Sequence, residues 1–272
     1  MHGVPLGNGS TRVVDCGGAA GHLRVEEPFW SENPEARGSG TGATLWNGSV
    51  QLARYLSASV GRGDLKPERV VELGAGGCGV PSLAAARLGF REVIATDGGS
   101  DDVEDNLIDL SRNAAANARE GSGCLVRIER LRWGEDVSAL GPPFGCVLAA
   151  EVVYEAACVR PLLQSLHSLS SETSMVLLYH TERNAEASAA FWRALPHFFR
   201  AELLQLPSPP DGALAADDGV AAQQQQQQQQ QQEEEEEKKE AGAAMTCHSE
   251  KKATRTMYGD GLFRLHRLGH TR

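Results

Sequence analysis

Short apolar runs recur along most of the chain, and the segments between them carry their apolar residues at helical spacing. The apolar runs predict strands at residues 69–73, 92–96, 124–131, 144–154, 174–180, 200–207 and 257–267. The helical spacing predicts helices at residues 46–58, 80–89, 103–120, 157–169 and 185–199. Because strands and helices alternate, the pattern predicts an α/β fold with a mostly parallel sheet and helices on both faces.

Two segments depart from this alternation. The glycine-rich residues 1–45 contain two extended pieces, 11–16 and 21–27, which predict a hairpin in an N-terminal extension. Residues 208–253 contain ten consecutive glutamines followed by five glutamates and have no apolar period. We therefore predict that they form a disordered low-complexity insertion between two late strands. The main domain is then formed by residues 46–207 and 254–268.

Composition and charge narrow the class of protein. With 272 residues, of which 41% are hydrophobic, the chain can bury a sizeable core. The net charge is −10, and residues 211–252 hold ten acidic and four basic residues, so the overall basic charge of a general nucleic-acid binder is missing. Neither an apolar leader nor a run of about 18 apolar residues occurs, which predicts a soluble protein outside membranes. We expect a cytoplasmic location, with the nucleus as the alternative.

The cysteines and histidines do not indicate a metal site. Six cysteines are scattered without a C-x-x-C pair, and most of them lie inside apolar runs. We therefore expect buried free thiols in a reducing compartment. The eight histidines show no ligand spacing, so we expect no metal cofactor.

The most distinctive stretch is RVVELGAGGCGVPSLAAARLG, residues 69–89, which places a glycine-rich turn between a strand and a helix. Gly74, Gly76 and Gly79 match G-x-G-x-x-G, a pattern that lets the backbone approach a ligand at a helix N-terminus. A Walker phosphate loop is excluded because no Gly-Lys-Ser/Thr follows. Asp97 ends the next strand, where a carboxylate can bind ribose hydroxyls. On these residues NAD and S-adenosylmethionine are nearly equal candidates.

Further residues favour S-adenosylmethionine over a dinucleotide. Glu72, just before the glycines, would repel a pyrophosphate but suits a cationic amino-acid moiety. Trp133 offers an aromatic ring to an adenine, and Glu151 with Tyr154 offers an acid and a phenol to a reacting centre. A carboxylate inside the apolar run that contains Glu151 is costly unless it faces a site or a partner.

Together these segments resemble the seven-β-strand protein-lysine methyltransferases (methyltransferase family 16). Within that family they are most similar to the group of valosin-containing protein, heat-shock-70 and elongation-factor lysine methyltransferases. The matching segments, in family order from Gly21 to Arg183, are GHLRV, TGATLWNGSVQLARYL, VVELGAGGCGVPSLAAARLG, VIATD, NLIDLSRNAAAN, LRWGED, VLAAEVVY and LLYHTER. The glycine motif is generic to methyltransferases, whereas the set of Trp46, Leu-x-Trp-Gly and Glu-x-x-Tyr is more specific.

The resemblance implies a Rossmann-like class I methyltransferase with a seven-stranded sheet, which transfers a methyl group from S-adenosylmethionine to a lysine of another protein. It also implies which residues contact the cofactor. Gly74, Ala75 and Gly76 lie under the methionine and ribose, and Asp97 binds the ribose hydroxyls. The other implied or inferred cofactor contacts are Trp133 at the adenine, Trp46 closing the site, the Ala150 backbone and Glu72.

On the acceptor side, Glu151 and Tyr154 match the acid-x-x-Tyr motif beside the lysine channel of the family, which more often has Asp at the first position. A lysine ammonium, with an ordinary pKa of about 10.4, must lose a proton before it can attack. A narrow and partly apolar channel lowers that pKa by desolvation. We expect Tyr154 to orient the amine, and Glu151 to attract the lysine and then accept a hydrogen bond from it.

Structural roles compete with these functional ones. Trp46 and Trp133 also suit core positions, and the hydroxyl of Tyr154 can cap a strand end. Two further pairs of residues have structural interpretations as well. Asn113 and Asn117 predict a polar helix face, and Tyr179 and Arg183 resemble a family motif but equally suit a structural role at a strand end.

Two other functions fit the same cofactor. One is a methyltransferase that acts on arginine, histidine or a small molecule, and the other is a non-catalytic S-adenosylmethionine-binding module whose acidic insertion recruits a partner. Glu151 and Tyr154 favour catalysis because a binding module does not need them. The resemblance further implies a chaperone, an AAA ATPase or a translation factor as the protein substrate, and we expect the protein to be a monomer.

Overall fold

The computed structural model describes residues 10–27, 40–98, 105–118, 124, 126–207 and 259–269. All of them belong to one unit, which comprises residues 1–207 and 258–272. The predicted low-complexity insertion, residues 208–253, lies outside the described residues. Its predicted disorder and the domain boundaries drawn around it therefore stay predictions.

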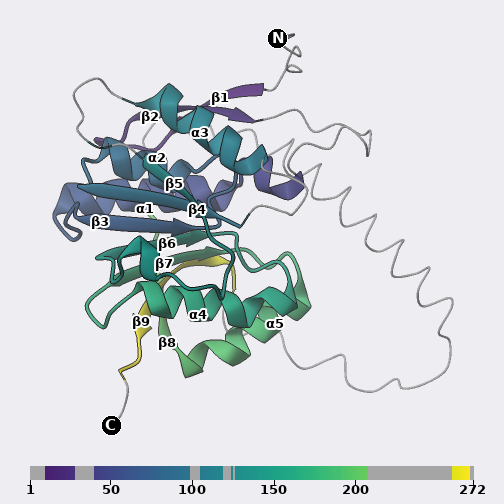
Figure 1. Ribbon diagram of the computed structural model, residues 1–272. Helices are drawn as coiled ribbons and strands as arrows, with labels where there is room; N and C mark the ends of the chain where they lie inside the picture. The colour runs from purple at the N-terminus through teal and green to yellow at the C-terminus, as the bar shows by residue number, and fades with distance from the viewer. Residues whose placement is uncertain are drawn as a thin grey trace, which may run out of the picture. The chain divides into compact units, whose positions relative to one another are not determined.

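A seven-stranded sheet forms the centre of the described residues (Figure 1). Its strands are β3 (Arg69–Leu73), β4 (Glu92–Asp97), β5 (Val126–Arg130), β6 (Cys146–Ala150), β7 (Met175–His180), β8 (Phe199–Leu204) and β9 (Gly261–Arg267). They lie in the order β5-β4-β3-β6-β7-β9-β8, with β3 to β7 parallel and β9 antiparallel to both of its neighbours. The predicted seven-stranded, mostly parallel sheet is confirmed.

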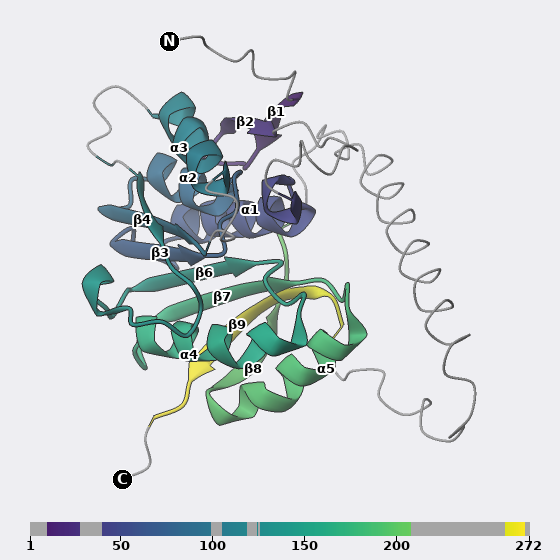
Figure 2. The ribbon, with the colours of Figure 1, turned by 45° about the vertical axis from the view of Figure 1, so that its right-hand side comes forward.

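Helices cover both faces of this sheet, as the sequence pattern predicts. They are α1 (Asn47–Arg62), α2 (Val80–Arg87), α3 (Asp105–Asn117), α4 (Val159–Leu169) and α5 (Ala185–Ala194). Figures 1 and 2 show α2 and α3 on one side of the sheet and α4 and α5 on the other. Successive residues of a strand point to opposite faces of the sheet. Val70 of β3 therefore packs with α1 and α2 on one face, whereas Val71 packs with α4 and α5 on the other.

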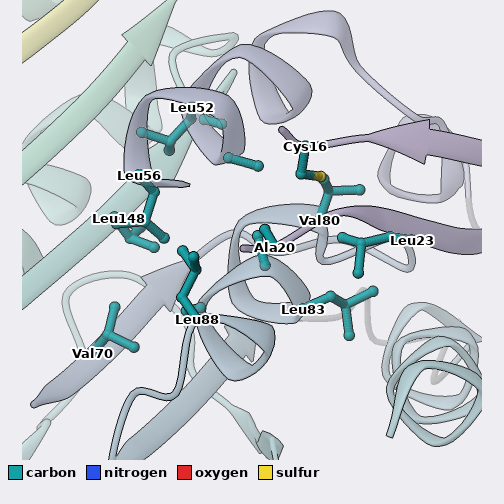
Figure 3. Close-up of a cluster of buried hydrophobic side chains, with 14 of the residues drawn as sticks. Cys16, Ala20, Leu23, Leu52, Leu56, Val70, Val80, Leu83, Leu88 and Leu148 are labelled. Carbon is teal, nitrogen blue, oxygen red and sulfur yellow. The ribbon is translucent and has the colours of Figure 1, made fainter. Parts of the chain in front are cut away.

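The predicted N-terminal hairpin is present as β1 (Ser10–Asp15) and β2 (His22–Glu27), paired antiparallel. Its inward-facing residues enter the core beneath α1 and α2. Cys16, Ala20 and Leu23 are fully buried, and Figure 3 shows them in one cluster with Val80 and Leu83 of α2. The hairpin therefore packs into the hydrophobic core of the main sheet instead of standing apart from it.

The predicted polar face of Asn113 and Asn117 on α3 is not exposed to solvent. Both side chains are buried. The amide of Asn113 bonds the backbone N–H and C=O of Glu26, and that of Asn117 bonds the same groups of Arg24. Each carboxamide thus offers one acceptor and one donor to the free edge of β2, as a neighbouring strand would. The sequence spacing shows that the two residues share a face but not that a strand edge covers it.

The predicted strand at 144–154 also needs a correction. β6 ends at Ala150, and Glu151 has a φ of +59°, which is uncommon for a residue with a side chain. The apolar residues that follow, Val152 and Val153, are buried in the loop after the strand. An apolar run alone does not distinguish a strand from a buried loop.

Among the residues that the structure describes, no helix has the length and hydropathy needed to cross a bilayer.

Candidate active site

The candidate site lies at the carboxyl ends of the central strands. β4 and β5 lie on one side of β3, whereas β6 and β7 lie on the other. The side on which successive strands are added therefore reverses between the parallel strands β3 and β6, and Leu73 pairs with Ala149 there. In open α/β sheets ligands bind at such a switch point, beyond the carboxyl ends of the strands. The residues that follow these two strands begin with Gly74 and Glu151.

The glycine-rich loop begins at Gly74, whose φ of +66° favours glycine. A Cβ at this position would stand 2.8 Å from Cγ1 of Val152 and 3.1 Å from the ring of Trp133. The Gly74 backbone thus approaches the loops that follow β5 and β6. This is the close approach that the glycine pattern predicts.

A segment before α1 covers the other half of this loop. The carbonyl of Gly42 accepts a hydrogen bond of 2.8 Å from the N–H of Gly77, and it occupies the position that a Cβ on Gly76 would need. The carbonyl of Ala43 accepts a bond of 3.2 Å from the Cys78 thiol. Gly76 is therefore required for packing within the chain, whatever ligand the loop binds.

Asp97 and Trp133 both lie beside the glycine loop. A carboxylate oxygen of Asp97 accepts a hydrogen bond of 2.9 Å from the N–H of Gly76, and the Asp97 carbonyl accepts one of 3.0 Å from Leu131. The second contact starts the loop that carries Trp133. The structure thus brings together the predicted ribose-binding carboxylate, the predicted adenine-side ring and the glycine backbone. Their contacts with a cofactor stay predictions.

Glu72 points away from this group. It is 2% exposed, and its carboxylate accepts a hydrogen bond of 2.8 Å from the N–H of Ser82 in the first turn of α2. Burial raises the pKa of Glu72 to about 7, although hydrogen bonds from Ser82 act in the opposite direction. Glu72 thus binds the N-terminus of α2, and a contact between Glu72 and a cofactor stays a prediction.

A raised pKa at Glu72 makes the stability depend on pH. Because the native state keeps a proton that the unfolded state releases, the contribution of Glu72 is full below about pH 4.5 and falls up to about pH 7, by about 3 kcal/mol. Glu72→Gln carries no such charge, so we expect its stability relative to wild type to increase over this window. Denaturant unfolding from pH 4.5 to 8 measures this, with the exposed Glu68→Gln as control. A constant difference between wild type and Glu72→Gln would contradict the shift.

Glu151 lies across the switch point and is firmly held. Its side chain is 2% exposed. One carboxylate oxygen accepts a hydrogen bond of 2.9 Å from the hydroxyl of Thr181, and the other lies 3.4 Å from Nε of Arg183. Its left-handed backbone conformation costs about 1–3 kcal/mol, a kind of strain that clusters at functional sites. The structure shows an acid that is paired within the chain.

Trp46, the residue that precedes α1, also belongs to this group. The guanidinium carbon of Arg183 lies 4.0 Å from the centre of the indole ring, a cation–π contact. Gly48, two residues further on, packs so closely that a Cβ would overlap the Glu151 carboxylate and the Tyr179 ring. Trp46, Glu151 and Arg183 therefore form one cluster, in which Arg183 contacts both a predicted cofactor residue and the predicted acid.

Tyr154 is the exposed member of the site. It is 50% exposed, and its ring centre lies 5.9 Å from that of Trp133. Partial burial, with the nearby charges of Asp97 and Glu155, raises the pKa of Tyr154 to about 12. The hydroxyl thus keeps its proton at neutral pH. Ala150, which ends β6, is buried beside this loop.

Sequence reasoning did not identify Thr181 and Gly42, and it left Arg183 between a family motif and a structural role. A carboxylate in an apolar run signals that some partner exists but does not say which. The signal for Gly42 is equally indirect, because glycine also occurs in ordinary turns. No group of three or more potential metal ligands is found in the described ranges, whose gaps fall within 28–39, 99–104, 119–125 and 208–258.

Comparison with known proteins agrees with this arrangement. A family model described as lysine methyltransferase matches residues 31–198. Protein N-lysine methyltransferase METTL21A of Danio rerio is 37% identical over 141 residues, 51% of this chain and 60% of that protein. Protein-lysine N-methyltransferase EFM3 of Chaetomium thermophilum is 31% identical over 163 residues, 57% of this chain and 46% of that protein. The chain thus spans about half the length of these two relatives.

Proposed function

Because the chain belongs to the lysine methyltransferase family, we propose that it transfers a methyl group from S-adenosylmethionine to the ε-amine of a lysine in another protein. One observation carries the proposal. The cofactor-type residues Gly74, Asp97 and Trp133, the acid Glu151 and the phenol Tyr154 all lie at the switch point between β3 and β6, with the Tyr154 ring centre 5.9 Å from that of Trp133.

The residues present fit S-adenosylmethionine. The Asp97 carboxylate suits the ribose hydroxyls, and the Trp133 ring, 3.1 Å from the Cβ position of Gly74, suits the adenine. The glycine backbone at Gly74 and Ala75 suits the methionine and ribose moieties. Trp46 and the Ala150 backbone complete the proposed cofactor set, whereas the Glu72 carboxylate turns to the N-terminus of α2. The cofactor supplies an electrophilic methyl group on a positively charged sulphur.

The chain's own residues position the acceptor amine, which attacks in its neutral form. Methyl transfer is an in-line displacement, so catalysis consists mainly of alignment and of a neutral amine. The Tyr154 hydroxyl, protonated at neutral pH, orients the amine by a hydrogen bond. The buried Glu151 carboxylate pairs with Arg183 and accepts a hydrogen bond from Thr181. It contributes by its fixed negative charge on the acceptor side. The proton of the lysine leaves to solvent.

Transfer of a labelled methyl group tests the proposal. The purified protein is incubated with methyl-labelled S-adenosylmethionine and a cell extract, and the labelled protein is hydrolysed. Label in methyllysine supports the proposal. Label in arginine, histidine or a small molecule would replace the acceptor, and binding of the cofactor without transfer would indicate a binding module.

The substrate protein belongs to the same proposal. A third relative, EEF1A lysine methyltransferase 3 of Mus musculus, is 27% identical over 197 residues, 72% of this chain and 76% of that protein. Its name points to a translation factor, and we propose a substrate among translation factors, chaperones and AAA ATPases. Mass spectrometry of proteins methylated by the enzyme identifies the target and the degree of methylation.

Replacing Tyr154 by phenylalanine separates orientation from cofactor binding. The change removes the hydroxyl and keeps the ring that packs on Trp133, so we expect cofactor affinity within about threefold of wild type. The rate of transfer should fall by about tenfold to a hundredfold because one orienting hydrogen bond is lost. Calorimetry with S-adenosylhomocysteine and single-turnover transfer measure the two quantities. Wild-type values for both would remove the hydroxyl from the mechanism.

A further inference from the structure

Arg183 links three segments of the chain that are far apart in the sequence. Its Nε lies 3.4 Å from the carboxylate of Glu151, the residue after β6. Its guanidinium stacks on Trp46, the residue before α1. Arg183 itself lies in the loop between β7 and α5. One side chain thus contacts both the acid of the acceptor side and a ring assigned to the cofactor side.

The Glu151 carboxylate depends on this contact. A buried carboxylate is costly unless it is paired and hydrogen-bonded. Within the described part of the chain, the carboxylate contacts the Thr181 hydroxyl and the Arg183 guanidinium. Because Glu151 already has a left-handed backbone, few other arrangements of this residue are open to it. Loss of the guanidinium would leave a buried charge beside one hydroxyl.

The Trp46 ring depends on tertiary contacts as well. Trp46 precedes α1 with an extended backbone and provides no side-chain cap. The same short segment contacts the glycine loop through Gly42 and Ala43, and Glu27 of the hairpin accepts a hydrogen bond of 2.8 Å from the N–H of Leu45. The stacking of Arg183 on Trp46 therefore joins the cover of the glycine loop to the acceptor side of the site.

The loop that carries Arg183 is itself fixed at each of its four residues. Thr181 and Arg183 contact Glu151. The N–H of Glu182 donates a hydrogen bond of 2.7 Å to Asp260 before β9, and Asn184 caps α5 by accepting one of 3.0 Å from Ala187. A residue in such a loop keeps a defined place relative to the sheet, as a positioning role requires.

We propose that Arg183 is a positioning residue, which holds Trp46 and Glu151 together and so aligns the acceptor side with the glycine-loop side. The inference rests on the proposed function for its effect on catalysis, but the contacts that carry it do not. Arg183 acts through its neighbours and needs no contact with a substrate. The sequence left the role of Arg183 open between a family motif and a structural role at a strand end, and the proposal gives it a positioning role.

The first test needs no ligand. Arg183→Met keeps length but removes the charge, and we expect it to change the near-ultraviolet circular dichroism assigned to Trp46. The assignment is made by repeating the substitution in a Trp46→Leu background, where the change should disappear. Arg193→Met, at an exposed arginine of α5, is the matched control. An unchanged spectrum, or the same change without Trp46, would overturn the stacking role.

The second test measures transfer. We expect Arg183→Met to lower kcat by about a hundredfold through misalignment while KM for the protein substrate changes by less than about threefold. Arg183→Lys, which keeps the charge, should recover about tenfold of this loss. A wild-type kcat in folded Arg183→Met would refute the proposal. An inactive wild type would refute the proposed function instead, and the spectroscopic result would still decide the role of Arg183.

Discussion

Replacing Asp97 by alanine is expected to lower the affinity for S-adenosylmethionine by a hundredfold or more, to the limit of detection. The carboxylate lies at the end of β4 and accepts a hydrogen bond of 2.9 Å from the N–H of Gly76. It thus shapes the glycine loop, and in the proposed complex it also binds the ribose hydroxyls. Hydrogen bonds to a charged group contribute about 1.5–3 kcal/mol each, and about 1.4 kcal/mol corresponds to tenfold in affinity.

Two further variants separate the two roles of Asp97. Asp97→Asn retains an oxygen that can accept from Gly76, so the loop should keep its shape while the charge is lost. We expect an intermediate loss of affinity for this variant. Glu92→Ala, at the opposite end of the same strand, breaks the ion pair with Arg69 and should leave the affinity unchanged. Calorimetric titration with S-adenosylhomocysteine measures all three, and near-normal binding by Asp97→Ala would remove the proposed cofactor site.

The fold was predictable because its signals are local and redundant. The inner strands β3, β4, β6 and β7 are mainly apolar runs, and the buried pattern of β6 shows that both of its faces are covered. The hairpin was also predictable, since a glycine-rich turn separates two alternating segments. In such elements the hydrophobic period, the turn residues and the topology indicate the same structure.

The site was predictable only in outline. The order of strand, glycine loop and acidic strand end indicates where a ligand binds, because the carboxyl ends of parallel strands meet at one edge. Side-chain directions are a different matter. Glu72 lies two residues before Gly74, and its side chain turns to Ser82. The partner of Glu151 is Arg183, which lies 32 residues later in another loop. Such partners are set by tertiary packing.

The burial of Asn113 and Asn117 was not predictable for the same reason. A polar pair at helical spacing is usually solvated, and nothing in the neighbouring residues indicates that a strand edge lies against it. The free N–H and C=O groups of β2 need partners when buried, and two carboxamides meet that need. The sequence contains both halves of the interaction, but they are 87 to 93 residues apart.

Replacing Gly48 by alanine is expected to lower the rate of transfer by about a hundredfold, although alanine is a better helix former than glycine. Gly48 lies in the first turn of α1, and its Cβ position is 2.8 Å from the carboxylate carbon of Glu151 and overlaps the Tyr179 ring. The added methyl group must displace both of them. Because Glu151 is held by Thr181 and Arg183 in a strained backbone conformation, displacement breaks the cluster on which the acceptor side depends.

Gly61→Ala in the same helix is the matched control. No atom lies within 4 Å of its Cβ position, so this substitution should raise stability by up to about 1 kcal/mol without changing the rate. Gly48→Ala should instead lose about 1–3 kcal/mol through overpacking, and denaturant unfolding measures both. Single-turnover transfer by folded protein then isolates the catalytic effect. If Gly48→Ala proved as active as Gly61→Ala, the position of the Glu151 carboxylate would not matter for transfer, because the methyl group cannot be accommodated without moving both the carboxylate and the ring beside it.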